Sequence, residues 1–331
     1  MTQIHRLPVG SPLLQPTLPP DQRALAAEVR ERLWFGEDDP QRTHLEASRT
    51  MAAHAAIATG LKPFPAAAQQ ALSVLRDPDA TMKAIVEAIE KDPALASRLL
   101  RVANSPAYRG SRRCATIGEA VVRLGSREVN QLVAAVATMG LFVDQSGLGV
   151  TWRDHLAGVA AIARVLSEDY GPSIGGQAFL CGLVHDLGKL LSLQVKEIPY
   201  ETLSPKVHAR PDEIHIVERV LVGYDHAVLG AHVLAQWRFP EIITEVVALH
   251  HQSGRAYAEG GDLALLVALV RLADALEYRL RQGAALPEDE YFEELARSSS
   301  ASYLELGPSI LRATWSRLAE ATSEISTVLV A

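Results

Sequence analysis

The stretch LCGLVHDLGKLL, residues 180–191, places three titratable side chains inside an apolar pattern. The pattern predicts one buried helix over residues 175–195. His185, Asp186 and Lys189 stand where an ordinary core helix would carry leucine. A buried carboxylate is costly unless it is paired or bound to a metal ion. The stretch therefore indicates a functional site inside a helical core.

The composition is typical of a globular, mainly helical protein. Of 331 residues, 48% are hydrophobic, 21% are charged and only 5% are aromatic, with alanine and leucine the commonest. This mixture favours helices over strands. The formal net charge of −7 argues against a general nucleic-acid partner. The arginine-rich segment RGSRRC, residues 109–114, is interpreted as a solvated loop.

Cysteine usage and the absence of export signals favour a cytoplasmic protein. Cys114 and Cys181 stand alone, without CxxC spacing, and are interpreted as small buried hydrophobic residues in a reducing compartment. No apolar run reaches the length of a membrane span. The N-terminus lacks the pattern of a secretory signal.

The chain divides into four predicted segments. Residues 1–60 are a proline-rich arm with a helical extension, 61–148 a first helical subdomain, 149–283 a second helical subdomain with a metal site, and 284–331 a tail of two helices. Helix starts are marked by Thr81, by Asp92 followed by Pro93, and by Thr116 with Glu119 at capping-box spacing. Gly125 is expected to end a helix.

No strand pattern competes with the helical periodicity, so the predicted fold class is all-α. A linker, residues 143–151, is expected between the two subdomains. In the second subdomain we expect helices near 152–169, 175–195, 212–222, 225–237, 241–251 and 262–281.

Metal-ligand residue types recur at apolar positions of the second subdomain. Five histidines and two aspartates, drawn from five predicted helices, are the candidate ligands: His155, His185, Asp186, His226, His250, His251 and Asp274. Helical bundles build metal sites in this way, from side chains that project inward from facing helices. Imidazole and carboxylate ligands suit one or two divalent transition-metal ions, with iron or manganese favoured and zinc or nickel as alternatives.

Each candidate ligand also has an ordinary structural interpretation. A histidine on an apolar helix is more often a hydrogen-bonded core residue, and His226 follows the helix cap Asp225. His250 and His251 could interact with a helix dipole, and Asp274 could pair with Arg271. The joint occurrence of all seven is what favours a metal site.

Other titratable residues receive weaker assignments. Lys189 could hold a phosphate or position water, or it could form an ion pair with Asp186. His232 is expected on the surface, and five further histidines fit no site, namely His5, His44, His54, His208 and His215.

The order His155, HDLGK at 185–189, and Asp274 resembles the HD superfamily of metal-dependent phosphohydrolases. The chain is more closely similar to the HDOD domain, a bacterial signalling module, over about residues 61–276. DPALASRLLRVANSPAYRG (residues 92–110) is the most specific segment, and residues 218–251 continue the similarity. The resemblance implies an all-α HDOD fold and a regulatory role.

The ligand order also resembles that of the HD-GYP cyclic-di-GMP phosphodiesterases, with two departures. Thr151 stands where a trinuclear HD-GYP centre would have a glutamate, and QSGRAYAEG after His251 lacks the GYP signature. These departures put in doubt the HD-GYP manner of binding a cyclic dinucleotide.

Two functions follow from these patterns. The first is a bacterial signal-transduction protein that has a His/Asp metal site and acts through contacts with signalling proteins. The alternative is a metal-dependent phosphohydrolase or phosphodiesterase acting on a nucleotide or cyclic dinucleotide, because two metal ions about 3.5–4 Å apart suit phosphoester hydrolysis. In that case Asp186 and Lys189 would be catalytic. In the metal-free protein Asp186 would be a partly buried charge without its compensating cation, so the sequence predicts that Asp186→Asn is neutral or stabilising in that state.

Overall fold

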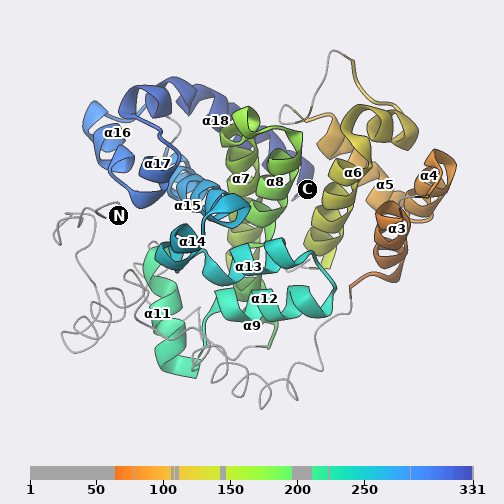
Figure 1. The fold of residues 1–331 in the computed structure, drawn as a ribbon, viewed down its shortest axis with the longest axis horizontal. Helices are drawn as coiled ribbons and strands as arrows, with labels where there is room; N and C mark the ends of the chain where they lie inside the picture. The colour runs from red at the N-terminus through yellow and green to blue at the C-terminus, as the bar shows by residue number, and fades with distance from the viewer. Residues whose placement is uncertain are drawn as a thin grey trace.

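The computed structural model describes residues 64–329, apart from 78, 106–107, 109–111, 142–146, 196–210, 223 and 284. Every regular element in this part of the chain is a helix (Figure 1), which confirms the all-α prediction. The predicted arm and extension, residues 1–60, lie outside the described residues. Among the described helices, none combines the length and hydrophobicity that a membrane span requires.

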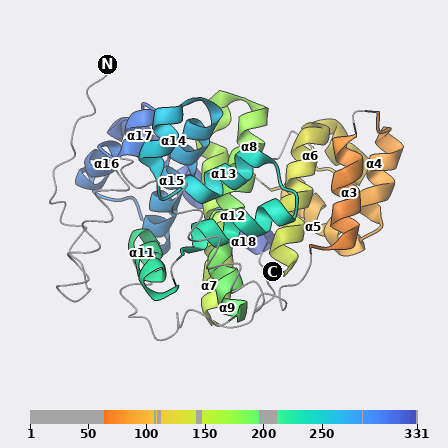
Figure 2. The same ribbon diagram turned by 60° about the horizontal axis from the view of Figure 1, so that its bottom comes forward.

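Four helices form one end of the molecule, to the right in Figures 1 and 2: α3 (Ala66–Arg76), α4 (Met82–Glu90), α5 (Pro93–Ala103) and α6 (Ile117–Leu141). The helix α6 packs against the other three.

The predicted helix-start signals act as expected in these four helices. Thr81 and Asp92 each accept a hydrogen bond from a backbone N–H of the first turn. Thr116 Oγ1 accepts from the backbone N–H of Glu119 at 3.2 Å. Gly125, with φ of 81°, interrupts α6 in the left-handed region that favours glycine, where the sequence predicts a helix end.

The centre of the fold is built from α7 (Gly147–Leu166), α8 (Pro172–Val184) and α15 (Gly261–Gln282), which pack against one another. Small residues let α7 and α8 approach closely, since a Cβ on Gly182 would lie only 2.8 Å from the Cα of Ala160. The helix α7 begins at Gly147, so the second half of the predicted linker is helical.

The stretch 175–195 is two helices, and the prediction of one continuous helix is wrong. The helix α8 ends at Val184, and α9 (Leu187–Val195) begins after a turn at His185 and Asp186. The backbone N–H of Lys189 bonds to the carbonyl of Asp186, three residues back, at 3.0 Å. Close packing of Gly188 on the backbone of His226 accompanies this tighter turn. The interruption lies at the two residues that the sequence singles out.

Four further helices cover one side of this centre: α11 (Pro211–Val222), α12 (His226–Gln236), α13 (Glu241–Leu249) and α14 (Ser253–Glu259). The helix α12 packs against both α9 and α13. Its predicted cap Asp225 accepts from the backbone N–H of Val228 at 2.9 Å. The helix α14 occupies a segment for which the sequence analysis predicts no helix.

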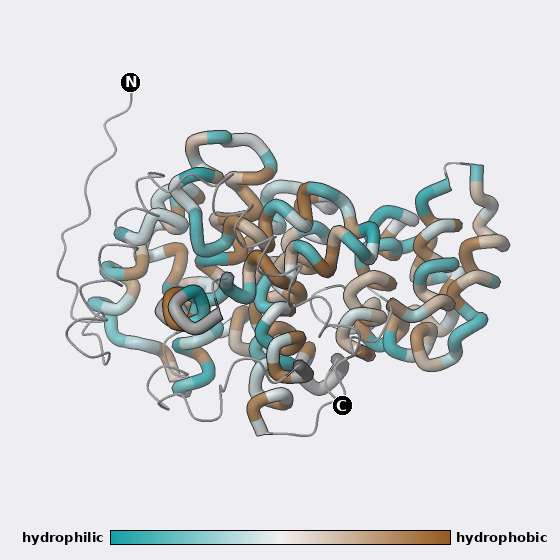
Figure 3. Tube along the Cα trace, turned by 90° about the horizontal axis from the view of Figure 1, so that it is seen from below, coloured by the Kyte–Doolittle hydropathy of each residue, from teal (hydrophilic) through white to brown (hydrophobic). Residues whose placement is uncertain are grey.

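The tail contains three helices where two are predicted: α16 (Asp289–Ala296), α17 (Ser299–Tyr303) and α18 (Pro308–Leu329). The extra helix exists because Ser298 caps it, accepting from the backbone N–H of Ala301 at 3.2 Å. The helix α18 packs along α7 and also contacts α5. Figure 3 shows hydrophobic and hydrophilic residues alternating along the helices, as expected of amphipathic elements.

Two smaller predictions are confirmed. Cys114 and Cys181 are both buried and free, and His232 is exposed on α12.

Candidate metal centre

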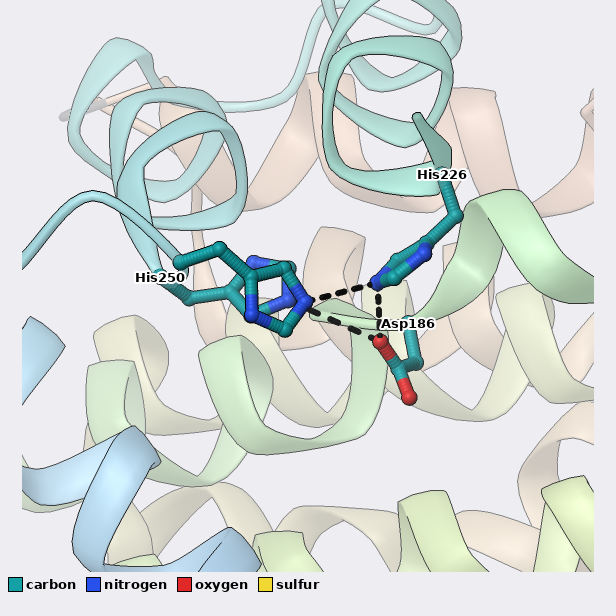
Figure 4. A group of neighbouring side chains, drawn as sticks. Asp186, His226 and His250 are labelled. Atoms are coloured by element: carbon teal, nitrogen blue, oxygen red, sulfur yellow. Dashed lines mark hydrogen bonds and ion pairs between the residues drawn. The ribbon is translucent and has the colours of Figure 1, made fainter. Parts of the chain in front are cut away.

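Asp186 lies at the centre of a buried cluster of histidines. Figure 4 shows His226, at the start of α12, and His250, just after α13, directed toward the Asp186 carboxylate. His155, from α7, approaches the other oxygen of the same carboxyl group, and Asp274, from α15, contacts His155. These residues come from helices that are distant in the sequence, as the prediction of a shared centre requires.

One oxygen of Asp186 belongs to a first group of candidate ligands. His155 Nε2 and His185 Nε2 each lie 3.5 Å from Asp186 Oδ2. Asp274 Oδ1 lies 3.3 Å from His155 Nε2 and so adjoins this group. Ligand atoms of His155, His185 and Asp186 all lie within 4.8 Å of one another, which is close enough for one metal ion to contact all three.

The other oxygen of Asp186 belongs to a second group. His226 Nε2 lies 2.8 Å and His250 Nε2 lies 3.6 Å from Asp186 Oδ1. His251 Nε2 is 3.0 Å from His226 Nε2. These four residues also offer ligand atoms within 4.8 Å of one another. The two oxygens of Asp186 therefore face two separate groups of candidate ligands.

Several polar atoms at the centre have no hydrogen-bond partner among the described residues, as expected of metal-ligand atoms. Four such buried atoms converge there: His155 Nε2, His185 Nε2, His250 Nε2 and Asp274 Oδ1. Leaving a buried polar group unsatisfied costs about 1–3 kcal/mol. Imidazole nitrogens and carboxylate oxygens are a donor set for divalent transition metals, so the residues present fit such ions.

The other ring nitrogens of four histidines are held by hydrogen bonds. His155 Nδ1 contacts Glu277 Oε2 and His226 Nδ1 contacts Glu218 Oε2, each at 2.6 Å. The Nδ1 atoms of His185 and His250 lie 2.8 and 2.6 Å from the backbone carbonyl oxygens of Gly182 and Val247. When Nδ1 donates to these acceptors, each Nε2 presents its lone pair to the centre, which is the usual arrangement around metal-binding histidines.

The buried carboxylates control the charge of two histidines in the metal-free protein. Burial alone would lower the pKa of His155, but Glu277, Asp186 and Asp274 together outweigh it and raise this pKa to about 9. Burial likewise opposes protonation of His226, and Glu218 and Asp186 together raise its pKa to about 9. Because a ligating imidazole nitrogen must be deprotonated, metal binding would release protons from both residues.

Three further candidate ligands, Asp186, His250 and His251, are already in the ionisation state that a metal ion requires. Burial would raise the pKa of Asp186, but Lys189, His185 and His226 hold it well below its usual range. Burial lowers the pKa of His250 to about 4 and holds that of His251 well below its usual value.

Lys189 forms an ion pair with Asp186 Oδ2, and both side chains are buried. The sequence allows Lys189 either to hold a phosphate or water, or to pair with Asp186, and this contact corresponds to the ion pair. Asp274 contacts His155 and has no ion pair with Arg271 among the described residues. Thr151 is exposed, and its hydroxyl donates to the carbonyl oxygen of Gly147 at 2.7 Å.

Three residues near the centre are missing from the sequence prediction. His215, assigned to no site, is in fact buried, and its ring stacks on His251 with centroids 4.1 Å apart. Glu218 and Glu277 are the carboxylates that hold His226 and His155. Glu277 lies one helical turn after Asp274, and Glu218 lies one turn after His215. That spacing is the only signal in the sequence, and it is common on ordinary helix surfaces.

A cavity of about 130 Å³ reaches the centre. Its metal-facing wall includes His185, His250 and Asp274. The lining also includes Arg271 and the segment around the start of α17. Four candidate ligands, His185, His250, His251 and Asp274, therefore border this cavity.

Comparison with known proteins places the chain in a family. The HDOD domain model matches residues 61–253, more than half of the chain. A structure of a candidate phosphohydrolase from Shewanella amazonensis SB2B is 27% identical and has a TM-score of 0.65. The match covers 81% of this chain and 94% of that one. An HDOD domain protein from Geobacter sulfurreducens is 22% identical with a TM-score of 0.66, and the match covers 88% of this chain and 99% of that one.

A curated relative extends beyond the matched region. An uncharacterised protein of Treponema pallidum (strain Nichols) is 25% identical over 247 residues, which are 70% of this chain and 46% of that protein. The chain therefore spans about half the length of this relative. From the extent of the family match, the chain belongs to the HDOD domain family.

Proposed function

We propose that this chain is a bacterial signal-transduction protein whose second helical subdomain holds two divalent transition-metal ions, and that it acts through contacts with signalling proteins. One observation carries the metal site: the two oxygens of Asp186 face two separate groups of histidines. Three buried imidazole nitrogens of this centre have no hydrogen-bond partner among the described residues, which favours a ligand role over a purely structural one.

In this proposal His155, His185 and Asp274 would hold one ion, and His226, His250 and His251 would hold the other. Asp186 would be shared by both groups, and Lys189 would balance its charge. Two bound divalent ions would supply Lewis-acid activation of a phosphoester and of water. Glu277 and Glu218 orient the imidazoles by accepting hydrogen bonds from their Nδ1–H groups.

A second candidate function is phosphoester hydrolysis at the same centre. The cavity favours it, because a purely structural metal site is normally closed to small molecules. The name of the Shewanella relative points to the same class of reaction. In this alternative Asp186 positions the ions, and Lys189 lies close enough to Asp186 to orient a phosphate or a water molecule.

Metal content tests the shared premise. We expect the purified protein, reconstituted with Mn²⁺ or Fe²⁺, to retain about two equivalents of metal. His226→Ala should lose roughly one equivalent, whereas His232→Ala on the exposed side of the same helix should retain both. Absence of bound metal in the reconstituted wild type would refute the site.

Hydrolysis assays then separate the two functions. The metal-loaded protein is incubated with phosphomonoesters, cyclic mononucleotides and cyclic dinucleotides. Turnover that Asp186→Ala abolishes would establish the hydrolase. If no substrate is turned over while metal is demonstrably bound, the result supports a metal-containing signalling protein without catalysis.

A further inference from the structure

The cavity beside the metal centre has a second wall that the family match does not include. Arg271 lies one helical turn before Asp274 on α15, and Ser298, Ser299 and Ser300 lie at the start of α17. All four residues line the cavity together with candidate metal ligands. They lie beyond residue 253, where the HDOD match ends.

Arg271 is held in place with hydrogen-bonding capacity left over. Its Nη1 donates to the backbone carbonyl oxygen of His250 at 2.5 Å, which fixes the guanidinium at the edge of the centre. Its Nε is buried and has no hydrogen-bond partner among the described residues. No acidic side chain in the described part of the chain forms an ion pair with it. A fixed guanidinium with free N–H groups is suited to a bidentate oxyanion.

The serines add neutral donors on the same wall. Ser298 Oγ accepts from the backbone N–H of Ala301, which leaves its own O–H free to donate. Ser300 Oγ shares a hydrogen bond with Tyr257 Oη at 3.1 Å, which fixes its position. Ser299, between them, is half-buried at the cavity. Hydroxyls beside a guanidinium can satisfy several oxygens of one anion.

We propose that Arg271 and Ser298–Ser300 form an anion subsite that takes the phosphoryl group of a phosphomonoester beside the metal centre. This inference rests on the proposed metal site. A phosphoryl group has three terminal oxygens, enough to meet the metal side, the guanidinium and a serine at once, whereas a carboxylate has only two.

The size of the cavity limits the ligand. About 130 Å³ is well below the roughly 300–1,000 Å³ of pockets that enclose drug-sized ligands. The cavity therefore takes the phosphate end of a ligand and not a whole cyclic dinucleotide. The tail helix α17 contributes to substrate selection by forming this wall.

Binding of inorganic phosphate to the metal-loaded full chain, measured by titration calorimetry, tests the subsite. Arg271→Gln and Ser299→Asp are each expected to weaken phosphate binding by roughly tenfold or more, the scale of hydrogen bonds to charged groups. Arg297→Gln is the matched control, since Arg297 is next to the serines but its side chain is 73% exposed and does not line the cavity. Its affinity for phosphate should be unchanged.

Metal content is measured in every variant, so that the two proposals fail separately. Wild-type phosphate affinity in both Arg271→Gln and Ser299→Asp, with metal bound, would overturn the subsite and leave the metal centre intact. If Arg271→Gln loses metal or fails to fold, Ser299→Asp decides. If the wild type binds no metal, the proposed function fails, and the effect of Arg271→Gln on phosphate binding to the metal-free protein still decides the subsite. A cyclic dinucleotide that displaces phosphate with higher affinity than phosphate itself would overturn the size limit.

Discussion

Contrary to the expectation from the sequence, replacing Asp186 by Asn in the metal-free protein should be strongly destabilising, because the carboxylate has a buried partner in Lys189. The Asp186 and Lys189 side chains are only 3% and 4% exposed, so solvent does not screen their ion pair. Neighbouring charges hold the pKa of Asp186 well below its usual range, so the carboxylate stabilises the fold at neutral pH, and this contribution is lost only as the pH falls through that low value. Asn has nearly the same shape, so the variant leaves the Lys189 ammonium buried without a counter-ion. Removing one partner of a buried pair costs about 3–5 kcal/mol.

Urea unfolding in the presence of EDTA measures this loss. We expect a decrease in the unfolding midpoint on the order of 1 M or more. The double variant Asp186→Asn with Lys189→Met should recover most of the loss, because no buried charge remains. Lys83→Met, which breaks an exposed pair with Glu87, is the control and should change stability by less than about 1 kcal/mol. Metal-free Asp186→Asn protein as stable as the wild type, or more so, would refute the reasoning.

Three further predictions concern the support of the centre and the interface between the helical layers. Glu218→Gln should weaken metal binding by roughly 10–100-fold in a competition titration with a chelator, because His226 loses its charged hydrogen-bond acceptor. Gly188→Ala should reduce both stability and metal content, because the new Cβ would lie 2.6 Å from the carbonyl carbon of His226. Gly118→Ala is the control and should change neither quantity, because its Cβ meets only an ordinary contact at 3.8 Å. Burial raises the pKa of Glu128 from 4.5 to about 7. Between these pH values the unfolded state loses the proton and the folded state keeps it, so wild-type stability should fall by about 3 kcal/mol as the pH rises. Glu128→Gln should therefore be more stable than the wild type at about pH 8 and similar to it near pH 4.5, and equal unfolding midpoints at both pH values would contradict this assignment.

The sequence predicts the helices of this fold well where local signals mark their ends. Asp92 followed by Pro93, and Gly125 with its positive φ, act through their own backbone geometry, so a short segment suffices to identify them. The break at His185 and Asp186 is different, because it accompanies the packing of Gly188 against α12. A contact between segments about 40 residues apart leaves no periodic signal in either segment. The short helix α17 escapes prediction because a single turn shows no apolar stripe.

The candidate ligands are accessible to sequence reasoning because charged groups on apolar helices are conspicuous. The residues that support these ligands cannot be recognised from the sequence in the same way. Glu218 lies on an amphipathic helix where an acidic residue is ordinary, and only the fold turns it toward His226. His215 is likewise recognised only when its ring is seen stacked on His251. Lys189 is ambiguous in the sequence, and the structure gives it a partner.

Anomalous diffraction from crystals of the protein loaded with Mn²⁺ or Fe²⁺ tests the central claim most directly. Two anomalous peaks are predicted, one on each side of the Asp186 carboxylate. One peak should contact His155 and His185, and the other should contact His226 and His250. A fully loaded crystal with no peak at Asp186, or with a single peak that leaves one histidine group unligated, would contradict a two-metal centre bridged by this residue.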